Sequence, residues 1–178
     1  FFDDVKVPVE NLVGQEHRGW DCAKLLLSNE RTGQAKVGPS KERLKMLRRL
    51  AGEVIVEGGP AIEQPLFAAR LAELEVRLRT LEMTTLRVLA GETDDIASRK
   101  PNPASSVLKI AGSTLHQDIS EAFVELAGMM GLSAMPDSAM PEWAVNAHSY
   151  YYNMRKLSIY GGSNEIQKTI MAKSFLGL

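Results

Sequence analysis

The sequence predicts an all-α fold: an up-and-down four-helix bundle preceded by a short N-terminal strand. Three observations support this fold class. Leu, Ala and Met are plentiful whereas aromatic residues make up only 6% of the chain, a composition that favours helices packed on helices. Apolar residues recur three or four positions apart over long stretches, the spacing of an amphipathic helix. With 178 residues, 44% of them hydrophobic, the chain can bury the core of one soluble domain.

The first element expected is a strand over residues 1–9, because Phe2, Val5 and Val7 recur at short spacing and Pro8 ends the run. A lone strand is unstable, so we expect its sheet partners to lie upstream. The first residue is Phe rather than Met, which indicates a piece of a longer protein. Residues 1–14 are therefore predicted to be the last strand and connector of an upstream β-domain, and residues 15–178 the helical bundle domain.

Four helices follow. Residues 19–57 predict one long helix, bent near Ala35 or Lys36 because Pro39 removes a backbone donor. The second helix is expected over 61–90 and ends at Gly91, the third over 105–130, and the fourth over 143–157, with a short helix after it. The apolar stripe of the second helix consists of Leu66, Leu71, Leu74, Leu78, Leu81 and Val88.

Charge and cysteine content exclude several classes of function. The net charge is −1 and no basic stripe is visible, so we expect no nucleic-acid partner. No apolar run is long enough to span a bilayer, which argues against a membrane partner. The single Cys22 excludes an internal disulfide and fits a reducing cytoplasm; we expect it to be a buried small apolar residue. The three histidines lie far apart without neighbouring ligands, so no metal site is expected.

The stretch from Ser158 to Gln167, SIYGGSNEIQ, carries the most information in the chain. Gly161 and Gly162 allow unusual backbone angles and close approach to the main chain, and Ser163 is a good N-cap for the helix that follows. The resulting turn directs unpaired N–H groups outward, which suits an anion or a polarised carbonyl. The alternative is an ordinary helix–helix turn with a cap.

The chain resembles the C-terminal helical domain of acyl-CoA dehydrogenases. The motifs that carry the resemblance are FDDVKVP at residues 2–8 with NLVG at 11–14, NER at 29–31 with Ala35, LAELE at 71–75, and IYGGSNEIQ at 159–167. Together they span essentially the whole chain. The last motif is the most specific, and the Glu30–Arg31 pair alone is weak.

The resemblance implies a flavoprotein oxidoreductase of fatty acid and lipid metabolism. Such an enzyme uses FAD to desaturate an acyl-CoA thioester and passes electrons to electron-transfer flavoprotein or a similar acceptor. The chemistry requires a base for the α-proton, donors to the thioester oxygen and a flavin that accepts hydride.

The resemblance also implies the site residues. Many family members carry the base as a Glu directly after the Tyr of the final turn, a position that Gly161 occupies here. Other members place it on the first helix just before an Arg, so Glu30 is predicted to be the base and Arg31 to orient the site. The alternative is a solvated Glu30 paired with Arg31 or Lys24.

The remaining expected roles belong to the final turn. By resemblance, the Gly161 N–H donates to the thioester oxygen and Tyr160 lines the acyl pocket, although Tyr160 could equally be bundle core. Gly162, Ser163 and Glu165 are expected to bind FAD. Glu165 fits a ribose hydroxyl, because a carboxylate beside a diphosphate is unfavourable.

The chain departs from the family where a subunit normally reaches its neighbour's flavin. Residues 53–60, EVIVEGGP, lack the usual Arg-x-x-Phe-Gly, and Pro65 stands where a Gln is usual. We therefore expect a hetero-oligomer with a related acyl-CoA dehydrogenase subunit, as in the steroid-side-chain and pimeloyl-type enzymes. The alternatives are a non-catalytic scaffold subunit of such a complex, and a flavin-dependent oxidase or hydroxylase.

Two further stretches are expected to have structural roles. The basic run from Lys41 to Arg49 is typical of a solvated helix face, with contact to a CoA phosphate as a minor alternative. Tyr150, Tyr151 and Tyr152 are expected to serve packing or a subunit interface.

Overall fold

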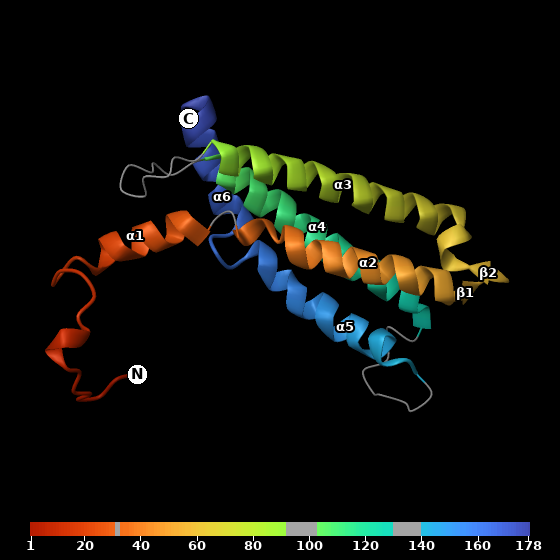
Figure 1. The fold of residues 1–178 in the computed structure, drawn as a ribbon, viewed down its shortest axis with the longest axis horizontal. Helices are drawn as coiled ribbons and strands as arrows, with labels where there is room; N and C mark the ends of the chain where they lie inside the picture. Colours follow the sequence, from red (N-terminus) through yellow and green to blue (C-terminus); the bar gives the residue numbers. More distant parts are fainter. Residues whose placement is uncertain (31–32, 92–102, 130–139) are drawn as a thin grey trace.

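The computed structural model describes residues 1–30, 33–91, 103–129 and 140–178. It confirms the all-α class and the up-and-down bundle (Figure 1). The four bundle helices are α2 (Val37–Glu53), α3 (Pro65–Ala90), α4 (Ala104–Ala127) and α5 (Glu142–Met154). After a 3-10 turn, Arg155–Ser158, the chain continues into α6 (Asn164–Met171) and a π-helical turn, Ala172–Leu176.

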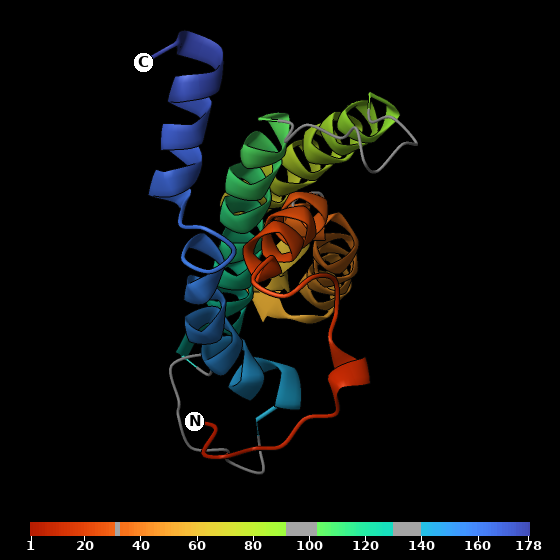
Figure 2. The ribbon, with the colours of Figure 1, turned by 90° about the vertical axis from the view of Figure 1, so that its left-hand side faces the viewer.

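Helix α4 is the centre of the fold. It packs against α2, α3, α5 and α6, and Figure 2 shows it between α2 and α3 on one side and α5 and α6 on the other. Leu108, Leu115, Ile119 and Phe123 are each no more than 1% exposed. Because α4 has partners on most sides, serines and a lysine are buried along it as well as apolar residues. Those polar side chains position the candidate site.

The stripe predicted for α3 is confirmed at Leu71, Leu74, Leu78, Leu81 and Val88, which are all buried. The prediction is wrong for Leu66, which is 89% exposed in the first turn of the helix. The predicted end at Gly91 is also confirmed, since Gly91 caps α3 with bonds to the last carbonyls.

The strand predicted over residues 1–9 does not form in this structure. Residues 1–8 have no regular structure, and Val9–Asn11 form a 3-10 turn. Phe2, Val5 and Val7 are 90%, 60% and 67% exposed. A strand needs a neighbour for its backbone hydrogen bonds, and the sheet found in the described residues is a separate two-stranded one.

The long bent helix predicted over residues 19–57 is wrong, because the structure has two helices. Helix α1 (Gly19–Glu30) and a 3-10 turn, Gly33–Ala35, precede α2, and Lys36 takes a left-handed conformation with φ +53°. Pro39 falls in the first turn of α2, where backbone N–H groups have no helical partner, so it starts the helix rather than bending it.

Helix α1 projects away from the bundle (Figure 1), and Trp20 is 69% exposed. Cys22 is exposed as well, contrary to the prediction that it is buried. Burial of this helix therefore depends on contacts that the described residues do not make.

The link between α2 and α3 is a small hairpin rather than a direct helix–helix turn. Strands β1 (Ile55–Val56) and β2 (Gly59–Pro60) pair antiparallel, with Ile55 opposite Pro60. A 3-10 turn, Ala61–Glu63, follows, so α3 begins at Pro65 instead of the predicted position 61. The hairpin lies at the end of the bundle opposite α1 and α6 (Figure 1).

Candidate active site

The elements that carry the predicted site residues meet at one stretch of α4. Gly112 is the point of closest approach to the turn that joins α1 and α2. A Cβ atom at Gly112 would overlap the carbonyl oxygen of Ala35 and lie 2.6 Å from its carbonyl carbon. Only glycine lets the two backbones come this close. Gly112 therefore positions the turn that follows the end of α1, where Glu30 lies.

The next turns of α4 hold the C-terminal elements. The Ser113 hydroxyl donates to Asn164 Oδ1 at 3.3 Å, which ties α4 to the first residue of α6. The Gln117 amide donates to the carbonyl oxygens of Met154 and Arg155, both at 3.1 Å, where α5 ends. The end of α1 and the connection from α5 to α6 thus lie at the same end of the bundle (Figure 1).

The Gly161–Gly162 turn is held in place by a buried glutamine. The Gln167 Nε2 donates to the carbonyl oxygens of Gly161 at 3.2 Å and Gly162 at 3.4 Å, and its Oε1 accepts from the Ser106 hydroxyl at 2.7 Å. Both glycines have positive φ, +67° and +84°. A Cβ at Gly162 would lie 2.5 Å from the Gln167 Nε2, so the turn requires glycine there.

The carbonyl groups of this turn face inward, and the Gly161 N–H remains unused. Gly161 is exposed, and its N–H makes no hydrogen bond to the part of the chain that the structure describes. An exposed N–H on a rigid turn can donate to an oxygen that arrives from outside. The geometry thus agrees with the donor role predicted for Gly161 without testing it.

Ser163 caps α6 as predicted, because its hydroxyl oxygen accepts from the Ile166 N–H at 3.4 Å. Glu165 lies in the first turn, and hydrogen bonds from the Ser163 hydroxyl and from its own backbone N–H lower the pKa of its carboxyl group. Lys109, 2% exposed, donates to Asn164 Oδ1 at 2.8 Å, and its burial lowers its pKa. The helix N-terminus and this lysine suit an anion, provided that the Glu165 carboxylate turns away.

Tyr160 is 38% exposed and lies beside the glycine turn. Burial, partly offset by the charge of Arg43, raises the pKa of Tyr150 on α5, and the charge of the nearby Tyr160 adds to this rise. Tyr150 donates to or accepts from His116 Nε2 at 2.6 Å, and His116 Nδ1 lies 2.9 Å from the Ser40 hydroxyl. Burial, followed by the charges of Arg43 and Lys36, lowers the pKa of His116 to about 4.

Two predicted site residues cannot be compared with the structure. Glu30 is the last residue of α1, but its side chain lies outside the described part, as does the whole of Arg31. Their roles as base and orienting residue remain predictions.

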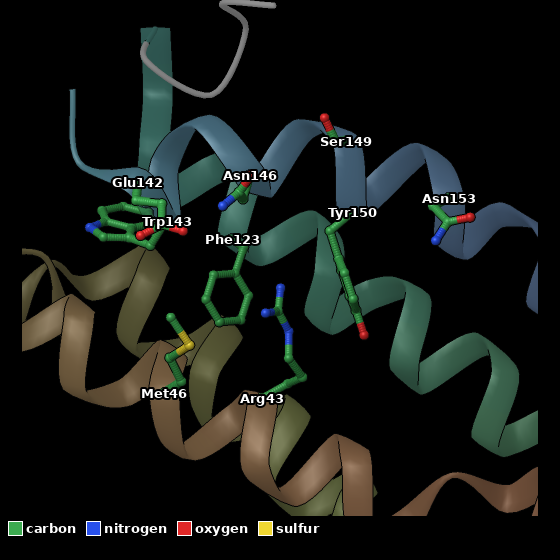
Figure 3. Close-up of a pocket in the computed structure, with 9 residues that line it drawn as sticks. All are labelled: Arg43, Met46, Phe123, Glu142, Trp143, Asn146, Ser149, Tyr150 and Asn153. Atoms are coloured by element: carbon green, nitrogen blue, oxygen red, sulfur yellow. The ribbon is translucent and has the colours of Figure 1, made fainter. Parts of the chain in front are cut away.

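Sequence reasoning missed a cavity between α2, α4 and α5 (Figure 3). Its volume is about 520 Å³, and its lining includes Arg43, Phe123, Trp143 and Tyr150. The sequence predicts that Arg43 belongs to a solvated basic face, but its guanidinium group lies between two aromatic rings (Figure 3). One signal in the sequence could have found it, because Arg43 shares a helix face with the apolar Leu47 and Leu50.

Among the described residues, no group of three or more His, Cys, Asp or Glu side chains could hold a metal ion. In the same part of the chain, none of the helices combines the length and apolarity that crossing a membrane requires.

A sequence model of the family described as acyl-CoA dehydrogenase, C-terminal domain, matches residues 17–176. The acyl-CoA dehydrogenase IpdE1 of Mycobacterium tuberculosis is 31% identical over 179 aligned residues, which cover 100% of this chain and 43% of that protein. The chain therefore spans less than half the length of this curated relative.

Solved structures agree on the fold. The acyl-CoA dehydrogenase from Geobacillus kaustophilus superposes with a TM-score of 0.77 at 25% identity. The match covers 100% of this chain and 44% of that protein's chain. The ChsE4–ChsE5 complex from Mycobacterium tuberculosis has a TM-score of 0.76 at 24% identity, with 100% and 45% covered. At such identity the second likeness shows the fold alone.

Proposed function

The chain belongs to the acyl-CoA dehydrogenase family, and from that premise we propose that the protein containing it desaturates an acyl-CoA thioester between its α and β carbons with FAD. The observation that supports this most is the exposed N–H of Gly161, which has no partner among the described residues and lies on a turn held by Gln167. A rigid backbone donor beside an acyl group stabilises the negative charge that develops on the thioester oxygen as the α-proton leaves.

Glu30 is proposed as the base that removes this α-proton. It ends α1, next to the turn that Gly112 positions against α4. Its carboxylate takes the proton while the Gly161 N–H holds the enolate oxygen, and Arg31 orients the two groups. Tyr160, half-exposed beside the turn, lines the acyl pocket.

FAD, when bound, supplies the acceptor for the β-hydride. Gly162, Ser163 and Glu165 are the residues of this chain proposed to hold it. The backbone N–H groups at the start of α6 suit its diphosphate, with Lys109 buried one layer behind. The Glu165 carboxylate conflicts with a diphosphate unless it turns outward to a ribose hydroxyl, because its present bond to Ser163 places it at the helix start.

The partners proposed are the acyl-CoA substrate, electron-transfer flavoprotein or a similar acceptor, and a related acyl-CoA dehydrogenase subunit. The hairpin between α2 and α3 supports the last of these. It carries Glu57 at its tip with φ +49° and has neither an Arg nor a Phe-Gly pair. The Glu57 carboxylate repels a neighbour's diphosphate, and without the Arg the hairpin has no cationic donor for it. A homo-oligomer of this chain would therefore lack a flavin contact that a different subunit can provide.

The same hairpin favours one alternative, a scaffold subunit that completes another chain's site without doing chemistry itself. The variant Glu30→Gln separates the two proposals. The full-length protein would be co-expressed with a related acyl-CoA dehydrogenase subunit from the same organism, and turnover measured with an artificial electron acceptor. A lost general base costs about 10²- to 10⁴-fold in rate, with flavin content unchanged. The control Glu16→Gln alters a carboxylate whose side chain is 81% exposed and should leave the rate as it is.

Turnover that survives Glu30→Gln would reject the catalytic proposal and leave the scaffold role. Flavin content tests the subunit proposal independently: if the full-length chain alone binds one flavin per chain and turns over, the hetero-oligomer is wrong.

A further inference from the structure

The guanidinium group of Arg43 is the most unusual charge in the described part of the chain. Its Cζ lies 4.1 Å from the centre of the Phe123 ring and 3.9 Å from the centre of the Tyr150 ring, and Figure 3 shows it between them. The faces of a guanidinium group attract aromatic rings, whereas its edges carry the N–H donors. The two rings therefore flank the guanidinium group, and a ligand reaches the charge through the N–H donors that the rings leave uncovered.

Within the described residues, no group neutralises this charge. Arg43 makes no hydrogen bond or ion pair with the described residues, and its Nε is buried without a partner. Two other arginines on the same helix are paired, Arg48 with Glu75 at 2.6 Å and Arg49 with Glu53 at 2.7 Å. A partly buried, unpaired cation costs free energy. An anionic ligand that pairs with it would remove this cost and gain binding free energy.

The cavity around Arg43 is large enough for such a ligand. Its volume of about 520 Å³ falls in the range of about 300–1,000 Å³ that small-molecule sites occupy. Figure 3 shows the Arg43 guanidinium directed toward α5, with the Asn146 amide above it. The side of the cavity away from Tyr150 is an apolar wall formed by Met46, Phe123 and Trp143. The cavity thus combines a cationic end with an apolar body.

We propose that this cavity binds an amphipathic carboxylic acid, with its carboxylate on the edge of Arg43 and its apolar part against Met46, Phe123 and Trp143. The choice of anion follows from the shape of the slot. A carboxylate is planar and meets a guanidinium edge in the same plane with two parallel hydrogen bonds. A tetrahedral phosphate is thicker and fits the space between two rings less well.

The position of the Tyr150 ring is fixed from behind. Its hydroxyl lies 2.6 Å from His116 Nε2, and His116 Nδ1 lies 2.9 Å from the Ser40 hydroxyl. His116 is 3% exposed and Ser40 is fully buried, so the part of this chain of polar groups behind Tyr150 is shielded from water. A ring braced in this way keeps Arg43 in one orientation before the ligand arrives, which lowers the entropy lost on binding.

The acidic residue on the rim agrees with this orientation. Glu142 lines the cavity, but Figure 3 places it beside Trp143, at the start of α5 and away from Tyr150. A ligand carboxylate at Arg43 is therefore separated from Glu142 by the apolar wall. The reverse orientation would bring two carboxylates together and is disfavoured.

The proposal does not depend on dehydrogenase chemistry, so it is tested by binding rather than by turnover. The probe is octanoate bearing a photoreactive diazirine, added to the full-length protein with and without a saturating acyl-CoA. After irradiation, we expect label on residues 142–153 or around Met46, both with and without acyl-CoA. Octanamide and octyl phosphate serve as the uncharged and tetrahedral competitors.

Arg43→Met keeps the length and apolar stem of the side chain and removes the charge. It should weaken octanoate binding about ten- to a hundredfold, the range that a lost charge-assisted hydrogen bond predicts. Arg49→Met removes an exposed, paired cation from the same helix and should change binding less than about twofold. Equal binding to Arg43→Met, equal competition by octanamide or octyl phosphate, or label displaced by acyl-CoA would each overturn the proposal.

Discussion

Replacing Gly112 with Ala tests how tightly α4 holds the turn between α1 and α2. The added Cβ would overlap the Ala35 carbonyl oxygen and lie 2.6 and 2.7 Å from the carbonyl carbon and Cα of Ala35. These are backbone atoms of a buried residue, 1% exposed, so no side chain can rotate away. Overpacking of this kind costs about 1–3 kcal/mol.

Replacing Gly with Ala inside a helix also contributes a gain of about 0.5–1 kcal/mol, because Ala loses less conformational freedom. Since the contact is with backbone, we take the upper part of the overpacking range and expect a net loss of about 2 kcal/mol in the free energy of unfolding. Urea denaturation of the full-length protein, followed by hydrogen exchange of residues 33–36 and 108–116, measures the loss and locates it.

Gly52→Ala provides the matched control, because a Cβ at Gly52 in α2 meets nothing within 4 Å. It should stabilise by up to about 1 kcal/mol. Adding Ala35→Gly to Gly112→Ala should not restore stability, since the clash is with the backbone of residue 35 rather than its methyl group. The reasoning fails if Gly112→Ala is as stable as Gly52→Ala, or if Ala35→Gly rescues it.

Two further predictions concern buried polar groups on α4 and α6. The pKa of His116 falls from 6.5 to about 4 on folding, so the unfolded chain binds more protons between these values. The free energy of unfolding should therefore decline as the pH drops from about 6.5 towards 4, by about 3 kcal/mol in the limit; the difference between wild type and His116→Gln in acid denaturation isolates this contribution. Gln167→Leu leaves two glycine carbonyls and the Ser106 hydroxyl unpaired and should cost about 1–3 kcal/mol, measured by urea unfolding, whereas Lys168→Leu, an exposed neighbour, should cost little.

Features set by local backbone preference were predictable from the sequence. The Gly161–Gly162 turn and the Ser163 cap depend on residues within one turn of each other, and both form as expected. The α3 stripe was predictable for the same reason, since burial on a long helix follows its period. Leu66 is not part of the stripe because it lies five positions before Leu71, which places it about 140° away around the helix.

Features set by distant partners were not predictable in this way. Whether residues 1–8 form a strand depends on backbone partners from elsewhere, and whether Cys22 is buried depends on what covers α1. The stretch of α4 from Gly112 to Gln117, which contacts the elements of the candidate site, carries no recognisable motif. Gly112 is important only because Ala35, 77 positions earlier in the chain (112 minus 35), lies against it, and a single sequence does not reveal such a contact.

Arg43 differs from its basic neighbours, and this difference raises the question whether its charge serves packing or ligand binding. Arg48 and Arg49 are largely exposed and paired, and such pairs contribute little to stability. Burial, partly offset by the charge of Tyr150, lowers the pKa of Arg43, so its charge is held at a cost. If Arg43 served packing alone, Arg43→Met would lower the free energy of unfolding, because its contacts with the Phe123 and Tyr150 rings are lost. If it serves a ligand, Arg43→Met should raise the free energy of unfolding of the ligand-free protein while binding of octanoate falls. Opposite changes in stability and binding from one substitution are the signature of a charge retained for binding, and parallel losses of both would show that Arg43 only holds α2, α4 and α5 together.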